Sequence, residues 1–177
     1  MTTPQETASS ADLTPSSAVE QRLAELGLTL PEVAAPVAAY VPAVVSGNHV
    51  YTSGQLPFIN GKLEATGKVS AGTAGASDEP TVSPEDAKAY AAVCAVNALA
   101  AVKSVIGDLD RVTRIVKVVG FVSSDPSFTG QPGVINGASE LLGRVFGDAG
   151  QHARSAVGVS VLPLDSPVEV ELIAEFS

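Results

Sequence analysis

The last stretch of the chain, GQHARSAVGVSVLPLDSPVEVELIAEF (residues 150–176), contains the clearest β-strand signals in the sequence. Its first part, Ser155–Leu162, is rich in valine. Its second part, Val168–Phe176, alternates valine and leucine with glutamate, which is the period-two pattern of a strand with one buried face. The connection Pro163–Pro167 begins and ends with proline, as expected of a turn. We therefore expect two strands to finish the chain, the second with one face in the core.

The segments before this stretch predict helices and further strands. Apolar residues at helical spacing indicate two long helices, and β-branched runs indicate strands. In chain order we expect a hairpin over Tyr40–Pro57 with a Gly47-Asn48 turn, a strand over Lys62–Val69, a helix from Ser83 to about Gly107, a strand over Arg114–Val122 and a helix over about Pro132–Phe146. This order predicts an α+β fold, a two-layer sandwich of a mixed β-sheet with two helices on one face. Since no helix is left for the other face, self-association is expected there.

The length of 177 residues fits one domain. Residues 1–15 are rich in Thr, Ser and Pro and are expected to form a disordered tail, with a single domain over 16–177. A capping box at Ser17–Glu20 predicts an N-terminal helix over 16–27, docked on the domain. The Gly-, Ala- and Ser-rich stretch 70–83 is expected to be a flexible loop.

The charge and the cysteine content exclude several functions. The net charge of −9 disfavours nucleic acid and anionic membrane as partners, although Arg111, Arg114 and Lys117 are close in sequence. We find no signal peptide and no uninterrupted apolar run of the ~18–20 residues that span a bilayer, so a cytoplasmic location is expected. The single cysteine, Cys94, lies in an apolar helical run and is expected to be a buried, unreactive thiol.

Familiar motifs of cofactor and metal chemistry are absent from the sequence. It has no P-loop, no dinucleotide-binding glycine pattern and no nucleophile elbow. Its two histidines, His49 and His152, lack ligand-like spacing, so no metal site and no cofactor are expected.

Arg154 stands where a loop enters the apolar strand of residues 155–162. An arginine at such a place is either a charge at the edge of the sheet or a cation directed into a cleft. In a cleft its planar guanidinium can bind a carboxylate through two charge-assisted hydrogen bonds. A structural pair with Asp or Glu is the alternative, and the residue by itself does not decide between them.

Short motifs over residues 39–176 occur in an order that identifies a family. They are Tyr40 before the hairpin, TSGQLP at 52–57, Gly67–Val69, Asn136, ARS at 153–155, Leu162-Pro163 and VEVE at 168–171. With this set the chain resembles the RidA (YjgF) superfamily, over roughly Ala39 to Phe176. The SGQ-P segment and the ARS strand with its downstream motifs are the specific parts. The resemblance is closest to a longer, endoribonuclease-labelled subgroup with an N-terminal helix.

The resemblance implies a chorismate-mutase-like fold and a homotrimer with clefts between subunits. It implies hydrolysis of reactive enamine or imine (2-imino acid) intermediates to 2-keto acids and ammonia, without cofactor or metal. Arg154 would hold the substrate carboxylate and act in catalysis with Glu169, while Tyr40, Ser53 and Asn136 would complete the substrate-binding site. Each of these residues also has a structural alternative, such as a turn cap for Ser53 or a solvated glutamate for Glu169.

Two positions depart from the family pattern. Where many RidA-type members have a cysteine two residues after the arginine, and often a glutamate two further on, this chain has Ala156 and Gly158. Two other functions therefore stay open. One is a non-catalytic trimer that binds a small carboxylate through Arg154, and the other is an endoribonuclease or translation inhibitor, which the acidic charge disfavours.

Overall fold

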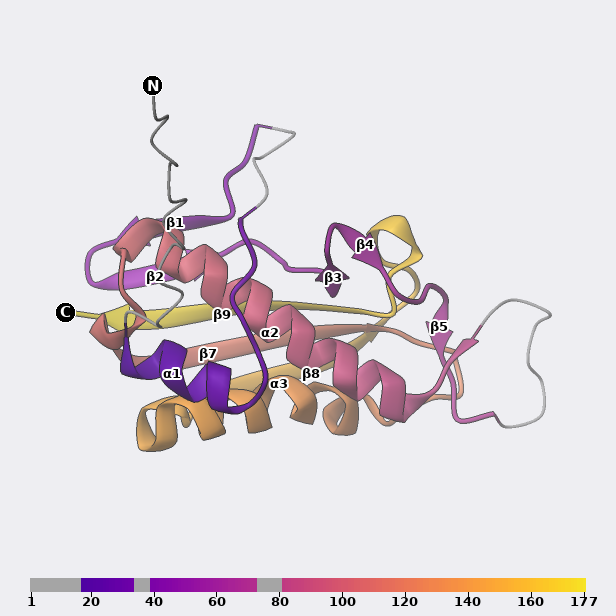
Figure 1. Ribbon diagram of the computed structural model, residues 1–177. Coiled ribbons are helices and arrows are strands. Elements are labelled where there is room, and N and C mark those ends of the chain that lie inside the picture. The colour runs from indigo at the N-terminus through magenta and orange to yellow at the C-terminus, as the bar shows by residue number, and fades with distance from the viewer. Residues whose placement is uncertain (1–16, 34–38, 73–80) are drawn as a thin grey trace, which may run out of the picture.

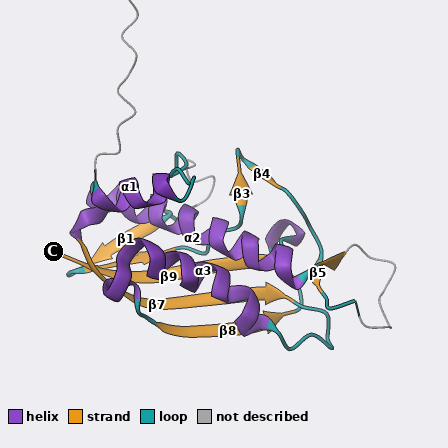
Figure 2. Ribbon diagram, turned by 60° about the horizontal axis from the view of Figure 1, so that its bottom comes forward, coloured by secondary structure: helices purple, strands orange, loops and turns teal. Residues whose placement is uncertain are grey.

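The computed structural model describes residues 17–33, 39–72 and 81–177, so the expected tail over 1–15 lies outside the described residues. A five-stranded mixed sheet forms one layer of the molecule. Two long helices, α2 (Pro84–Ile106) and α3 (Gln131–Phe146), form the second layer on one face of that sheet (Figures 1 and 2). The predicted α+β two-layer sandwich is confirmed.

The strands of the sheet are arranged in the order β1-β2-β9-β7-β8. They are β1 (Ala43–Ser46), β2 (His49–Thr52), β9 (Val168–Phe176), β7 (Val112–Ser123) and β8 (Ala153–Val159). All neighbours are antiparallel except β7 and β8, which are parallel and are joined by the crossover helix α3. The two strands that finish the chain are therefore not neighbours, because the crossover puts β8 on the outer side of β7 and β9 returns on its inner side.

Both long helices begin and end at residues suited to those places. The Ser83 hydroxyl accepts a hydrogen bond from the Asp86 amide at 3.0 Å, and Pro84 occupies the first position of α2. The helices end at Gly107 (φ 85°) and Gly147 (φ 61°). A positive φ costs glycine little because it has no Cβ, so the chain can turn away from the helix there.

Helix α3 lies close to its neighbours because a glycine occupies each of two contacts, Gly137 in α3 itself and Gly120 in β7. A Cβ at Gly137 would overlap the Lys88 carbonyl oxygen of α2, and a Cβ at Gly120 of β7 would overlap the Ile135 side chain. The first contact packs α3 against α2, and the second packs it against β7 of the sheet. The helix side chains that face β8 are thereby brought to the strand on which Arg154 lies.

The N-terminal helix α1 (Ala18–Glu25) docks against the domain, as expected. Its Ser17 cap accepts a hydrogen bond from the Glu20 amide at 3.1 Å. The Asp110 carboxylate accepts hydrogen bonds from the Val19 and Ala18 amides at 2.9 and 2.8 Å, and these bonds lower the pKa of Asp110. An ion pair of 2.7 Å joins Glu20 to Lys103 of α2. The helix is thus held through its first turn.

The segment between β2 and α2 differs from the prediction. The expected strand over Lys62–Val69 is divided into β4 (Lys62–Leu63), which pairs with β3 (Phe58–Ile59), and β5 (Lys68–Val69). Gly67, with φ 110°, interrupts it. Within the stretch 70–83, β6 (Thr81–Val82) pairs with β5 in parallel, so the last part of that expected loop is a strand. Residues 73–80 lie outside the described residues.

The face of the sheet opposite α2 and α3 carries apolar side chains that no described helix covers (Figure 2). Tyr51, Val44 and Val157 remain 42%, 50% and 45% exposed on it. Their strand partners Ile173 and Phe121 lie on the same face. We call this surface the open face. Its composition is that of a surface suited to another protein chain.

Helix α2 is, by length and mean hydropathy, the one helix of the described residues that could span a membrane. Lys88, Asn97 and Lys103 interrupt its apolar sequence, so the expectation that no uninterrupted apolar run of this length occurs still holds. Length and hydropathy alone are weak evidence, since a buried core helix passes the same test. Here many apolar residues of α2, including Cys94 and Leu99, are fully buried in the core, whereas Val105 is 39% exposed. Burial, followed by the Glu169 charge, raises the pKa of the Cys94 thiol, in keeping with the predicted unreactive cysteine.

Candidate functional site

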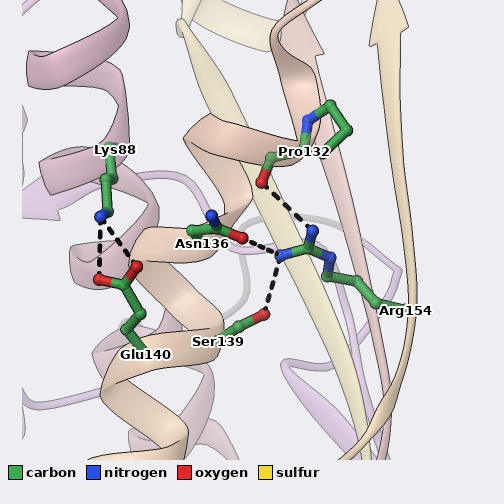
Figure 3. Close-up of polar contacts among 6 residues, drawn as sticks. All are labelled: Lys88, Pro132, Asn136, Ser139, Glu140 and Arg154. Atoms are coloured by element: carbon green, nitrogen blue, oxygen red, sulfur yellow. Dashed lines mark hydrogen bonds and ion pairs between the residues drawn. The ribbon is translucent and has the colours of Figure 1, made fainter.

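Arg154 lies on β8 and reaches α3 with its side chain (Figure 3). Its Nη1 donates to Oδ1 of Asn136 at 2.8 Å and to Oγ of Ser139 at 3.1 Å. Its Nη2 donates to the Pro132 carbonyl at 3.2 Å. Asn136 and Ser139 are three residues apart and therefore share one face of the helix. The predicted proximity of Arg154 and Asn136 is thus present within one chain.

All three acceptors that hold Arg154 are neutral. The ion pairs of the described residues are Lys88–Glu140 and Lys103–Glu20, and neither involves Arg154. The structural pair with Asp or Glu is therefore not found within the described residues. Of the five guanidinium hydrogens, three are used, and Nε–H and one Nη2–H have no acceptor among these residues. A partly buried cation with free donors is suited to an anionic ligand.

Glu169 lies on the opposite face of the sheet from Arg154. Arg154 is paired with Val118, which is fully buried under the helices. Glu169 is paired with Phe121, three residues further along β7, and alternates with the buried Val168 and Val170. Since side chains alternate between faces, an odd separation along β7 puts the two residues on opposite sides. One chain does not bring Arg154 and Glu169 together.

The Glu169 carboxyl is half-buried against the chain after β2. A Cβ at Gly54 would overlap Glu169 Oε1, so only glycine leaves room for this side chain as it lies. Burial raises the pKa of Glu169, and the neighbouring Glu171 charge raises it further. A desolvated carboxylate is a stronger base than a solvated one. The glycine of the SGQ motif therefore has a specific physical role beside Glu169.

Ser53 precedes Gly54 in the chain and is bonded to the segment that contains Tyr40. The Ser53 hydroxyl donates to the Val41 carbonyl at 2.7 Å, which ties it to the segment that begins with Tyr40. Tyr40 itself is 60% exposed. Gln55 then forms a two-way backbone bridge with Val170 of β9, next to Glu169. The predicted residues thus fall into two groups, Arg154 with Asn136, and Glu169 with the segment that contains Ser53.

Ala156 and Gly158 lie on the same face as Arg154, at alternate positions of β8. Ala156 packs against the core. A Cβ at Gly158 would lie 2.8 Å from Gln131 Nε2 and 3.1 Å from Ser124 Oγ. Gln131 is held there by a hydrogen bond of 2.7 Å to the Phe128 carbonyl. The place of a longer side chain at 158 is therefore occupied by Gln131.

A shallow depression of about 260 Å³ lies before α3 and is lined by Ala71, Ser127, Phe128, Thr129 and Gly130. None of the predicted site residues lines it. It is open to solvent, and we assign the functional site to the Arg154 group instead, since a charged group with free donors is found there. No cluster of three metal-ligating side chains occurs within the described residues.

Two of the basic residues near β7, Arg111 and Lys117, are engaged in contacts within the chain. Arg111 donates to the carbonyls of Ser177 and Ile106 and lies 5.0 Å from the Phe176 ring. Lys117 donates to the Ser155 hydroxyl at 2.9 Å on the open face. Arg111 therefore serves to hold the end of the chain.

Sequence reasoning missed two residues of the Arg154 group, Ser139 and His152. His152 Nε2 lies 2.9 Å from Ser139 Oγ, which in turn accepts from Arg154. The spacing contains a signal for each. Ser139 follows Asn136 by three residues on a helix, and His152 precedes Arg154 by two on an extended chain. Only the packing of α3 against β8 shows that Ser139 and His152 are in contact.

The fold, the strand order and these motif positions define a chorismate-mutase-like α+β domain. The chain belongs to the YjgF (RidA) family, since the family model described as "YjgF/chorismate_mutase-like, putative endoribonuclease" matches residues 20–176. Protein TCP17 of Trypanosoma cruzi is 43% identical over 163 residues, which cover 92% of this chain and 96% of that protein. The resemblance drawn from the short motifs is confirmed.

Solved structures agree with this assignment. The Atu1372 protein of Agrobacterium tumefaciens, described as having unknown function, has a TM-score of 0.79 and 45% identity, covering 90% of this chain and 94% of that one. TdcF of Escherichia coli, solved with bound serine, has a TM-score of 0.54 and 25% identity, covering 80% and 91%. The serine complex is a property of TdcF.

Proposed function

We propose that this protein hydrolyses small 2-imino acids, formed from reactive enamines, to 2-keto acids and ammonia. The observation that carries the proposal is the guanidinium of Arg154, which among the described residues is held by neutral acceptors only and has no acceptor for Nε–H and one Nη2–H. A carboxylate is the ligand that supplies two oxygens to such donors, and charge-assisted bonds of this kind are worth roughly 1.5–3 kcal/mol each. The relative TdcF, solved with the amino acid serine, is in keeping with a small ligand of this class.

The reaction needs a base rather than a cofactor. Water adds to the carbon of the protonated imine while the Glu169 carboxylate takes one proton of that water, and the product is a carbinolamine. Glu169 returns this proton to the amine nitrogen, the C–N bond breaks, and the departing ammonia takes the hydroxyl proton as the ketone forms, so that one water is consumed and one ammonium ion is released. Burial raises the pKa of Glu169, which makes its carboxylate a better base. A positioned base contributes about 10²–10⁴-fold, which suits a substrate that already hydrolyses slowly in water.

The proposal requires two copies of the chain at each site. Arg154 and Glu169 lie on opposite faces of the sheet within one chain, so they can meet one substrate only if a second copy supplies one of them. We propose a homotrimer with its sites in clefts between subunits. The open face, with Tyr51, Val44 and Val157 exposed, is the apolar surface available for this assembly.

The test couples an amino-acid oxidase, or a dehydratase that releases 2-aminoacrylate, to detection of ammonia. We expect the wild type to accelerate release and Arg154→Ala to abolish the acceleration. Arg154→Lys should lose most of it, because an ammonium cannot reproduce the planar fork. Arg144→Ala, an exposed arginine on the same helix as Asn136, is the matched control and should retain full activity. A wild type without acceleration, or an undiminished Arg154→Ala, overturns the proposal.

A second function is favoured by Ala156 and Gly158, where the family pattern often has reactive or acidic side chains. The space at Gly158 is taken by Gln131 and Ser124, so the cleft wall beside Arg154 lacks a further acid. In this alternative the protein binds a small carboxylate without turnover. Thermal stabilisation by 2-oxobutyrate, lost in Arg154→Ala and accompanied by no ammonia release, would identify it.

A further inference from the structure

A chain of hydrogen bonds leads from Arg154 back to the loop before β8. Arg154 Nη1 donates to Ser139 Oγ at 3.1 Å, and Ser139 Oγ lies 2.9 Å from His152 Nε2. His152 Nδ1 lies 2.6 Å from the Gly150 carbonyl. Ser139, His152 and Arg154 are all partly buried. The chain thus links a helix, a strand entrance and the turn that precedes it.

The chemistry of the two ends determines the direction of every bond. The Gly150 carbonyl can only accept, so His152 Nδ1 carries a hydrogen. In a neutral imidazole the other nitrogen is then an acceptor, and the Ser139 hydroxyl donates to it. The lone pairs of Ser139 Oγ are consequently left to accept from Arg154. The histidine tautomer therefore orients the serine as an acceptor for the guanidinium.

Because Ser139 is oriented as an acceptor, it can bind one of the two hydrogens on Nη1 of Arg154. These two hydrogens are taken by Asn136 and Ser139, from successive turns of α3 (Figure 3). Without Ser139 the guanidinium would keep only the Nη1 bond to Asn136 and the longer Nη2 bond of 3.2 Å to the Pro132 carbonyl, and could turn more easily. With both Nη1 bonds present, the plane is fixed and the free Nε–H and Nη2–H keep one direction. Glu140, next to Ser139, is paired with Lys88 at 2.9 Å and takes no part.

We propose that Ser139 and His152 are positioning residues for Arg154, which present its free donors to the carboxylate of a 2-imino or 2-keto acid. This inference depends on the proposed carboxylate role of Arg154. Ser139 does not touch the substrate, and His152 acts through Ser139. Loss of either residue weakens carboxylate binding without removing the charge.

The first test measures the affinity for 2-oxobutyrate by calorimetry. We expect Ser139→Ala and His152→Ala to bind roughly five- to tenfold more weakly, the loss of about one hydrogen bond. Ser139→Thr keeps the hydroxyl and His152→Gln keeps an acceptor, so both should recover most of the affinity. In turnover assays KM should rise while kcat changes little. Glu140→Gln, which disturbs only the Lys88 pair, is the control and should bind as the wild type does.

The second test needs neither binding nor turnover. Nitrogen-15 NMR of the histidine ring should show hydrogen on Nδ1 of His152, assigned by its loss in His152→Gln. The Arg154 guanidinium should show slow rotation about its Nε–Cζ bond in the wild type and faster rotation in Ser139→Ala and His152→Ala. A hydrogen on Nε2, or unchanged rotation in both variants, overturns the positioning role. If the wild type neither binds 2-oxobutyrate nor releases ammonia, the proposed function fails, while the NMR result still decides the positioning.

Discussion

Arg154 and Glu169 lie on opposite faces of the same sheet, with β7 between their strands. Arg154 faces α3 and is bonded to Asn136, whereas Glu169 faces away from the helices and lies against Gly54. The two residues that the proposed reaction requires are therefore separated by the sheet itself. Under the proposed function, a shared site would require a second copy of the chain.

Mixing two inactive variants tests whether sites are shared between subunits. Arg154→Ala and Glu169→Gln should each be inactive alone. In a trimer assembled at random from equal amounts of both, one site of each mixed trimer receives an intact Arg154 and an intact Glu169 from neighbouring copies. Co-expression should therefore restore about a quarter of the wild-type ammonia release.

The matched control for mixing is Arg154→Ala with Asn136→Ala. Both residues belong to the same group within one chain, so no intact group is regenerated and activity should stay absent. Equal recovery in both mixtures, or none in either, would contradict sharing between subunits.

Gly54→Ala should disturb Glu169 specifically. The added Cβ would overlap the Glu169 carboxyl, which must then change its side-chain conformation. We expect a loss of about 1 kcal/mol in the free energy of unfolding and a large loss of activity. In a Glu169→Ala background the loss of stability should largely disappear, whereas a Glu171→Ala background should leave it unchanged. The wild type, Gly54→Ala, one background variant and the double variant form a double-mutant cycle, and denaturant unfolding of its four proteins measures the coupling energy between the two positions. An equal coupling energy of Gly54→Ala with Glu169→Ala and with Glu171→Ala would argue against the contact between Gly54 and Glu169.

Glu169→Gln should raise stability at neutral pH. Burial raises the pKa of Glu169 above its unfolded value of about 4.3, so the folded state disfavours the ionised form. The stability contributed by this group is fully present below pH ~4.3 and is lost as the pH rises through the folded pKa. Because the group is half exposed, solvent screening limits the difference to less than about 1 kcal/mol.

The measurement for this substitution is the melting temperature of wild type and Glu169→Gln across pH 4 to 8. The difference between the two proteins should grow with pH in favour of Glu169→Gln and then become constant. A difference that instead favours the wild type as the pH rises would show that the carboxylate is stabilised in the fold.

Gly137→Ala should destabilise the contact of α2 with α3. The Cβ would overlap the Lys88 backbone carbonyl, which cannot move without moving the helix, so we expect a loss of about 2–3 kcal/mol. Gly143→Ala, on the same helix but with no atom within 4 Å of the new Cβ, is the control. It should gain up to about 1 kcal/mol, since alanine favours helix over glycine. Urea unfolding compares the two, and an equal effect would rule out close packing at Gly137.

Much of the fold could be predicted from local pattern. The helix starting at Ser83 and Pro84, the Gly47 turn of the hairpin and the alternating strand of residues 168–176 all appear where the sequence indicates them. These features depend on neighbouring residues and on backbone preferences, which a short window contains. The strand expected over Lys62–Val69 was wrong, because Gly67 interrupts it and its ends pair with different partners.

The candidate site, too, could be predicted only in part from the sequence. The sequence alone determined the residue types and their order, from Tyr40 through Ser53 and Asn136 to Arg154 and Glu169, because each motif is a short local stretch of the chain. It also made Asn136 a neighbour of Ser139 on one helix face, and His152 a neighbour of Arg154 along the strand.

Only the tertiary structure decided which face each of these residues occupies. Arg154 meets Asn136 and Ser139 because Gly120 lets α3 lie close to β7, while Gly137 lets it pack against α2. Glu169 turns away because the register of β9 on β7 pairs it with Phe121. Alternation along a strand says that neighbours point apart, but the pairing of distant strands and the side that the helices cover determine where they point.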